Sequence, residues 1–94
     1  PEEIGHVYER LGGLRFSRKQ FRNARDSYLR ALQFDSYSGT IPYSLALTYD
    51  HLREYKSAVT WYKRFLKTAL GDPNMAKQAK EAKARVKLLE GGKQ

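Results

Sequence analysis

Two histidines are the first residues to consider for acid–base or metal chemistry. His6 and His51 lie far apart in the chain, and Asp50 directly precedes His51. Adjacent residues on a helix point roughly 100° apart, so Asp50 and His51 cannot work as a facing pair there. Neither histidine has a second histidine at helical spacing, and the chain has no cysteine to complete a zinc site. We therefore expect both to face solvent or a partner, and we expect no catalytic residue and no metal site.

Other kinds of reactive site are also missing from the sequence. The chain contains no cysteine, which excludes a disulfide scaffold, a thiolate metal site and a cysteine nucleophile. The double glycines at 12–13 and 91–92 lack the rest of any phosphate-binding loop. We expect no cofactor, and we expect the chain not to be an enzyme.

Length and charge limit the remaining function classes. The chain has 94 residues, enough for one small domain. Its net charge of +8 favours acidic partners and keeps nucleic acid and anionic lipid under consideration. No apolar run approaches the roughly 18 residues of a membrane span. The start at Pro1-Glu2-Glu3, without Met, favours a mature form or an excised piece. The compartment stays unknown, with a soluble, cytoplasmic protein as the default expectation.

An internal repeat is the main organising feature. When the sequence is shifted so that Gly5 falls on Gly39, it matches itself without a gap. We call this shift one repeat period. The identical pairs are mostly small or apolar, which suits a shared packing pattern. They are Gly5 and Gly39, Leu11 and Leu45, Ala24 and Ala58, Tyr28 and Tyr62, Arg30 and Arg64, and Leu32 and Leu66.

Each repeat unit reads as two helices, because apolar residues recur at three- and four-residue steps. A further helix follows Asp72-Pro73, with an apolar stripe of Met75, Ala79, Ala82, Val86 and Leu89 and an opposite, polar side of Lys77, Lys80, Arg85 and Lys87. We expect one unit at 1–38 (helices at about 2–17 and 20–34) and another at 39–71 (helices at about 40–52 and 54–70), then a capping helix at 72–90 and a flexible tail at 91–94.

The spacing resembles the tetratricopeptide repeat (TPR) family, over residues 5–72. The motif residues are Tyr8, Leu11-Gly12, Phe21, Ala24, Tyr28 and Ala31 in one unit, and Leu45-Ala46, Tyr49, Tyr55, Ala58 and Tyr62 in the other. Departures from the family pattern are Arg15, Ser36, Pro42, Phe65 and Leu70. The resemblance implies an all-α fold, an α-α superhelix (a TPR-like solenoid of antiparallel helix pairs) with about five helices.

The resemblance also implies a function. It predicts a non-catalytic protein–protein interaction module, a scaffold or adaptor, whose concave groove is lined by the first helix of each unit. By position, the expected groove residues are His6, Glu9, Gly13, Phe16, Thr40, Tyr43, Leu47, Asp50, Asn74, Lys77 and Glu81. The family's carboxylate clamp for chaperone tails is absent, since its positions hold Glu9, Gly13 and Ser44. We therefore expect another protein or peptide as partner, with acidic character favoured, and no chaperone-tail binding.

Two other functions stay open. The chain could self-assemble into a homo-oligomer as a structural module of a larger complex, because about three repeats are usually needed for independent stability. Trp61 is either packed under the capping helix or exposed as an interface anchor. Nucleic-acid binding is the least favoured function, and it would use the basic residues Arg18, Lys19, Arg22, Arg25 and Arg30.

Overall fold

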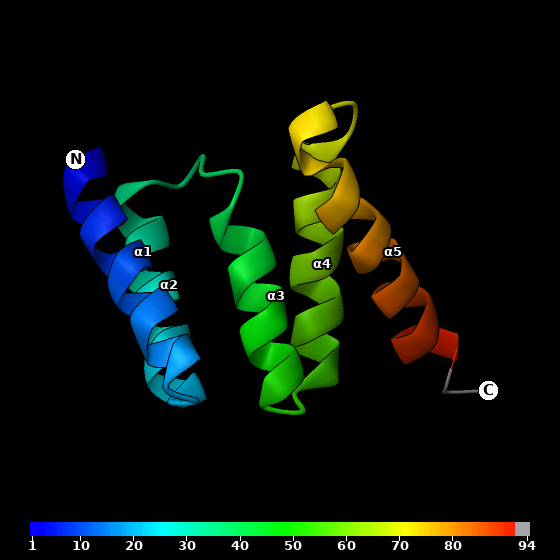
Figure 1. The fold of residues 1–94 in the computed structure, drawn as a ribbon, viewed down its shortest axis with the longest axis horizontal. Coiled ribbons are helices and arrows are strands. Elements are labelled where there is room, and N and C mark those ends of the chain that lie inside the picture. Colours follow the sequence, from blue (N-terminus) through cyan, green and yellow to red (C-terminus); the bar gives the residue numbers. More distant parts are fainter. Residues whose placement is uncertain (92–94) are drawn as a thin grey trace.

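The chain folds as a row of helices. A computed structural model describes residues 1–91 and contains five α-helices and one 3₁₀ turn in that range (Figure 1). Of the tail predicted at 91–94, Gly91 ends the last helix and the rest lies outside the described residues. The elements are α1 (Glu2–Ser17), α2 (Phe21–Phe34), α3 (Ile41–His51), α4 (Tyr55–Ala69), η1 (Pro73–Met75) and α5 (Ala76–Gly91).

Each helix packs against the next one in the chain. The α1–α2 pair is followed by the α3–α4 pair, and α5 lies against α4 at the far end of the row (Figure 1). The resulting body measures 41 × 30 × 19 Å. The predicted fold class, all-α with about five sequentially packed helices, is therefore confirmed.

The turns inside the two helix pairs have the same geometry. Lys19 and Arg53 are the non-glycine residues with positive φ among residues 1–91, at 61° and 62°, and they stand one repeat period apart. Such left-handed backbone is uncommon outside glycine, so its recurrence marks one shared turn. The hydrogen bonds recur too. Gln20 donates its N–H to the carbonyl of Arg15 at 2.9 Å, and Glu54 donates to Tyr49 at 3.0 Å.

The core is built around small residues where helices approach closely. A Cβ on Gly12 would lie 2.7 Å from Cε1 of Tyr28, so only glycine fits between α1 and that ring. Ala24 and Ala58, one period apart, are both fully buried. Two clusters result, and Trp61 packs against both. The first holds Ala24, Tyr28, Ala31, Ile41 and Leu45, and the second holds Ala46, Ala58, Tyr62, Phe65, Ala69 and Ala82.

The last helix begins with a capped turn. The Asp72 carboxylate accepts the backbone N–H of Asn74 at 2.9 Å, and Pro73 opens the 3₁₀ turn that precedes α5. Met75, Ala79, Ala82, Val86 and Leu89 all join the second cluster, as their spacing predicted. None of the helices within residues 1–91 is both long and apolar enough to cross a membrane.

Candidate partner-binding groove

A cavity of about 540 Å³ opens between α3 and α5. Most of its lining comes from those two helices, and α4 contributes Tyr55 and Tyr62. The lining combines aromatic and aliphatic surface with four charged side chains. The residues are Tyr43, Leu47, Asp50, His51, Arg53, Tyr55, Tyr62, Glu81 and Arg85. We name this cavity the α3–α5 groove.

An ion pair crosses this groove. Arg85 of α5 donates to Asp50 of α3 through Nε at 2.6 Å and through Nη2 at 2.7 Å. Tyr62 adds an O–H donor to the same carboxylate at 2.9 Å. A carboxylate that accepts two guanidinium bonds and a hydroxyl bond is well satisfied. Asp50 is 12% exposed and Arg85 37%, so the arginine still reaches solvent.

The proton affinities of these groups reflect their contacts. Burial alone would raise the pKa of Asp50, but the hydrogen bonds from Arg85 and Tyr62 outweigh it and hold the pKa below its usual value. Burial raises the pKa of Tyr62, and its bond to Asp50 raises it further. The hydrogen bond with Asp50 also raises the pKa of Arg85. At neutral pH the pair is therefore fully charged.

A second polar link joins the same two helices. The Tyr43 hydroxyl donates to the Glu81 carboxylate at 3.0 Å. Burial, together with that bond to a carboxylate, raises the pKa of Tyr43 to about 12. The Tyr43 ring packs on Phe65, with centroids 4.9 Å apart, and lies edge-on to Tyr62 at 6.2 Å. Two polar contacts, Tyr43 with Glu81 and Asp50 with Arg85, thus join α3 to α5 across the groove.

The structure brings together four of the residues predicted from sequence. Tyr43, Leu47, Asp50 and Glu81 all line the α3–α5 groove. The other seven lie elsewhere. Glu9 accepts a hydrogen bond from the Thr40 hydroxyl at 2.8 Å, Phe16 packs among aromatic rings, and His6, Gly13, Asn74 and Lys77 are exposed outside the groove lining.

Sequence reasoning missed the arginine at the centre of the groove. The sequence pattern assigned Arg85 to the polar side of the last helix with the lysines, and this assignment was wrong, because the guanidinium turns to Asp50. Arg85 follows Glu81 by four residues and so shares its helix face. It also stands one period after His51. Its spacing from Glu81 and from His51 could have indicated Arg85 as a groove residue. The groove residues His51, Arg53, Tyr55 and Tyr62 were missed as well.

One repeat period earlier, where the α1–α2 pair meets α3, three aromatic rings take the place of this ion pair. Phe21 stacks on His51 with centroids 4.6 Å apart, and Phe16 lies edge-on to both at 5.1 Å. His51 is therefore stacked on one ring and perpendicular to another, between the helix pairs, while its side chain stays exposed. This arrangement favours a structural role for His51 over an acid–base role.

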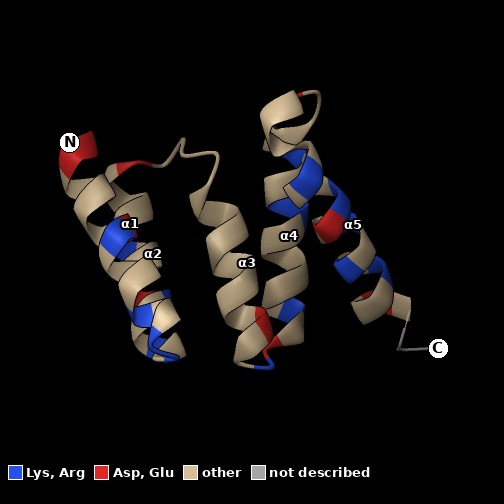
Figure 2. Cartoon of the chain, viewed as in Figure 1, with Lys and Arg blue, Asp and Glu red and all other residues tan. Residues whose placement is uncertain are grey.

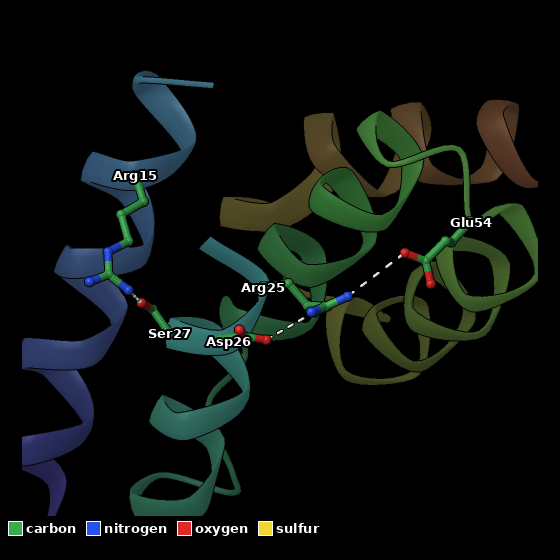
Figure 3. A network of polar contacts seen from close by, with 5 residues as sticks. All are labelled: Arg15, Arg25, Asp26, Ser27 and Glu54. Atoms are coloured by element: carbon green, nitrogen blue, oxygen red, sulfur yellow. Dashed lines mark hydrogen bonds and ion pairs between the residues drawn. The ribbon is translucent and has the colours of Figure 1, made fainter. Parts of the chain in front are cut away.

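One of the basic residues considered for nucleic-acid binding, Arg25, is paired with carboxylates. Arg25 bridges Asp26 at 3.0 Å and Glu54 at 3.8 Å, which links α2 to the start of α4 (Figure 3). In the same view Arg15 donates to Ser27 at 3.1 Å. Figure 2 shows Lys and Arg spread over several helices without one continuous stripe. The ion pairs of Arg25 reduce the free positive charge at that position of α2.

Within residues 1–91, no group of three or more His, Asp or Glu side chains is placed to hold a metal ion. The shortest polar contacts in the groove join α3 to α5. No family model matches this chain, and neither does any curated protein or any solved structure.

Proposed function

We propose that this chain is a non-catalytic helical-repeat module of the tetratricopeptide type that binds a peptide segment of another protein in the α3–α5 groove. The recurrence of the turn at Lys19 and Arg53 supports the repeat assignment, because backbone geometry repeats together with sequence. Two helix pairs and a capping helix then form one short array, and its groove is the binding surface.

One observation carries the binding proposal: the groove combines apolar anchoring surface with satisfied polar groups. Leu47, Tyr43 and Tyr55 offer aliphatic and aromatic surface, and Asp50 with Arg85 supplies an ordered ionic group beside them. Anchors of this type surrounded by polar side chains are typical of protein interfaces. The two links between α3 and α5 keep the groove preformed, which lowers the entropic cost of binding.

The charges favour an acidic segment. Arg85 is held in place by Asp50 yet remains partly exposed, so a ligand carboxylate can approach its outer side. Arg53 lines the same groove and is exposed. The net charge of +8 speeds encounter with acidic partners. We therefore propose a protein segment that presents an apolar side chain next to a carboxylate.

Photo-crosslinking tests the location of binding. A benzoylphenylalanine placed at Tyr55, in the groove, should capture a protein from a lysate of the source. The same group at Tyr37, which is 96% exposed in the loop before α3, should not. Arg53→Glu should remove the adduct, whereas Arg10→Glu, with the same charge change on α1, should keep it. Equal adducts from positions 55 and 37 would contradict binding in the groove.

Self-association is a second candidate, because α1 leaves apolar side chains uncovered. Ile4, Val7 and Leu14 are 42%, 64% and 48% exposed, and their spacing places them along one side of the helix. Two copies could cover this stripe by packing α1 against α1. Sedimentation distinguishes the cases: a wild-type dimer that Val7→Ser converts to a folded monomer would favour assembly, and a wild-type monomer at all concentrations would oppose it.

A further inference from the structure

A second, more apolar cavity lies on another side of α5. It measures about 470 Å³ and runs between the end of α4 and the first half of α5. Leu70 lines it and is 82% exposed. We name this cavity the α4–α5 groove, and its lining is Leu66, Ala69, Leu70, Gly71, Asp72, Pro73, Ala76, Ala79, Lys80 and Lys83.

The molecule itself shows what covers such a groove one period earlier. Leu66, Ala79 and Lys83 correspond, one repeat period back, to Leu32, Leu45 and Tyr49. Those earlier residues belong to the core cluster between α2 and α3, onto which Trp61 of α4 packs. The Trp61 side chain of α4 therefore covers part of the surface between α2 and α3. Since the backbone repeats with the same period, the α4–α5 groove has the shape to receive a helix.

The α4–α5 groove differs in charge from the surface between α2 and α3 one repeat period earlier. Lys80 replaces Ala46, which is fully buried against α4, and Lys83 replaces Tyr49. Among residues 1–91, neither lysine forms an ion pair with a carboxylate. Lysine stems can line apolar surface while their ammonium groups meet opposite charge. A helix that fits here must present carboxylates where α4 presents apolar atoms.

We propose that the α4–α5 groove binds an acidic amphipathic helix of a partner protein. Its apolar side would cover Leu66, Leu70 and Ala79, and its Asp or Glu side chains would pair with Lys80 and Lys83. A second copy of this chain is a poorer occupant, because both copies carry +8. The site goes beyond the proposed α3–α5 groove. Glu81 and Arg85 face that groove, while Lys80 and Lys83 face this one, so both can be filled together.

A selection experiment tests the proposal with a defined probe. A displayed library of helical peptides carries leucines at three- and four-residue steps, with Asp, Glu, Lys, Arg, Ser or Gln allowed at the flanking positions. Helices selected on the full chain at about 150 mM salt should be enriched in Asp and Glu. In a nuclear magnetic resonance titration, the selected peptide should shift the amides of Leu70 and Ala79.

Charge reversal then locates the site. Lys80→Glu with Lys83→Glu should weaken the selected peptide by about tenfold or more, because two attractive pairs become repulsive. Arg22→Glu with Lys56→Glu makes the same change in net charge on exposed sites of α2 and α4, and should alter affinity by about twofold at most. Leu70→Ser, at an exposed side chain, should weaken binding independently of charge.

Several results would overturn the proposal. They are an absence of selected helices, selection without acidic enrichment, equal weakening by the two double variants, or amide shifts at Tyr43 and Leu47 in place of Leu70 and Ala79. A wild-type dimer that becomes monomeric only with Lys80→Glu and Lys83→Glu would assign the groove to a second copy and would also overturn it.

Discussion

The ion pair of Arg85 with Asp50 joins α5 to α3. It takes the position that an aromatic contact between α1 and α3 takes one repeat period earlier. The earlier contact is made by Phe16 and His51, whose ring centroids lie 5.1 Å apart. Each member of the ion pair stands one repeat period after its aromatic counterpart. One structural position thus holds two kinds of interaction. The aromatic version stacks rings that are only partly buried, whereas the ionic version places charged atoms beside a cavity.

The first prediction concerns the attachment of α5. Arg85→Met keeps an unbranched apolar stem but removes the guanidinium, and it leaves Asp50, which is largely buried, with one hydroxyl donor. We expect a loss of about 1–2 kcal/mol, below the value for a fully buried pair because Arg85 is partly solvated. Hydrogen exchange should quicken most in α5. Lys87→Met on the exposed side of α5 is the matched control, and an equal effect there would contradict this role for Arg85.

The sequence predicted the helices well for a physical reason. Apolar periodicity and the internal repeat report packing that is local and regular, so α1 to α4 followed from spacing alone. The same spacing predicted the apolar stripe of α5. It did not predict the 3₁₀ turn at Pro73–Met75, which depends on the cap made by the Asp72 side chain.

The groove was only half predictable. Tyr43, Leu47 and Asp50 share one face of α3, so their proximity follows from helical geometry. The position of Arg85 depends on how α5 is rotated against α4, which the pattern of alanines on α5 does not specify. A long, flexible arginine also moves its charge far from its Cα, and only a partner such as Asp50 fixes where that charge lies.

The second prediction concerns acid stability. The folded-state pKa of Asp50 lies below the 3.8 of an unperturbed aspartate, so the unfolded chain takes up this proton first as the pH falls. The stabilisation is complete at neutral pH and is lost as the pH drops from about 5 through that folded value. Asp50→Asn should be less stable at neutral pH and should lose less further stability on acidification. Denaturant titrations at neutral and acidic pH measure both effects.

The control for this acid effect is Glu3→Gln, which changes an exposed carboxylate in the first turn of α1. It should keep most of the acid dependence of the wild type. If Asp50→Asn kept the full wild-type dependence, the ion pair would not contribute to stability through ionisation of Asp50.

The third prediction compares two adjacent glycines of α1. Gly12→Ala places a Cβ 2.7 Å from the Tyr28 ring, so it should destabilise the fold by about 1–3 kcal/mol through overpacking. Gly13→Ala meets its nearest atom, the Tyr28 hydroxyl oxygen, at 3.7 Å. It should therefore stabilise the fold by up to about 1 kcal/mol through helix propensity. Thermal unfolding of both variants gives the comparison, and the same sign for both would contradict the close approach at Gly12.

The fourth prediction concerns alkaline pH. Burial and the bond to Glu81 raise the pKa of Tyr43 from 10.0 to about 12. The unfolded chain therefore releases this proton first, and the stabilisation is complete below pH 10 and is lost as the pH rises through about 12. Ultraviolet titration of the folded protein should show a late tyrosine step, and Tyr43→Phe should lower its amplitude by one tyrosine, because Tyr62 also ionises late. Tyr37→Phe, at a fully exposed ring, should leave that step unchanged.

The same variant separates the hydrogen bond from the packing of the ring. Tyr43→Phe keeps the contact with Phe65 and removes only the hydroxyl donor to Glu81. Glu81 is exposed, so water can replace the lost donor, and the cost below pH 10 should be about 1 kcal/mol or less. If the stability loss were much larger, the hydroxyl would be essential for positioning α5 against α3. If Tyr43→Phe left the amplitude of the late step unchanged, Tyr43 would not contribute to it, and other buried tyrosines, such as Tyr62, would be its whole source.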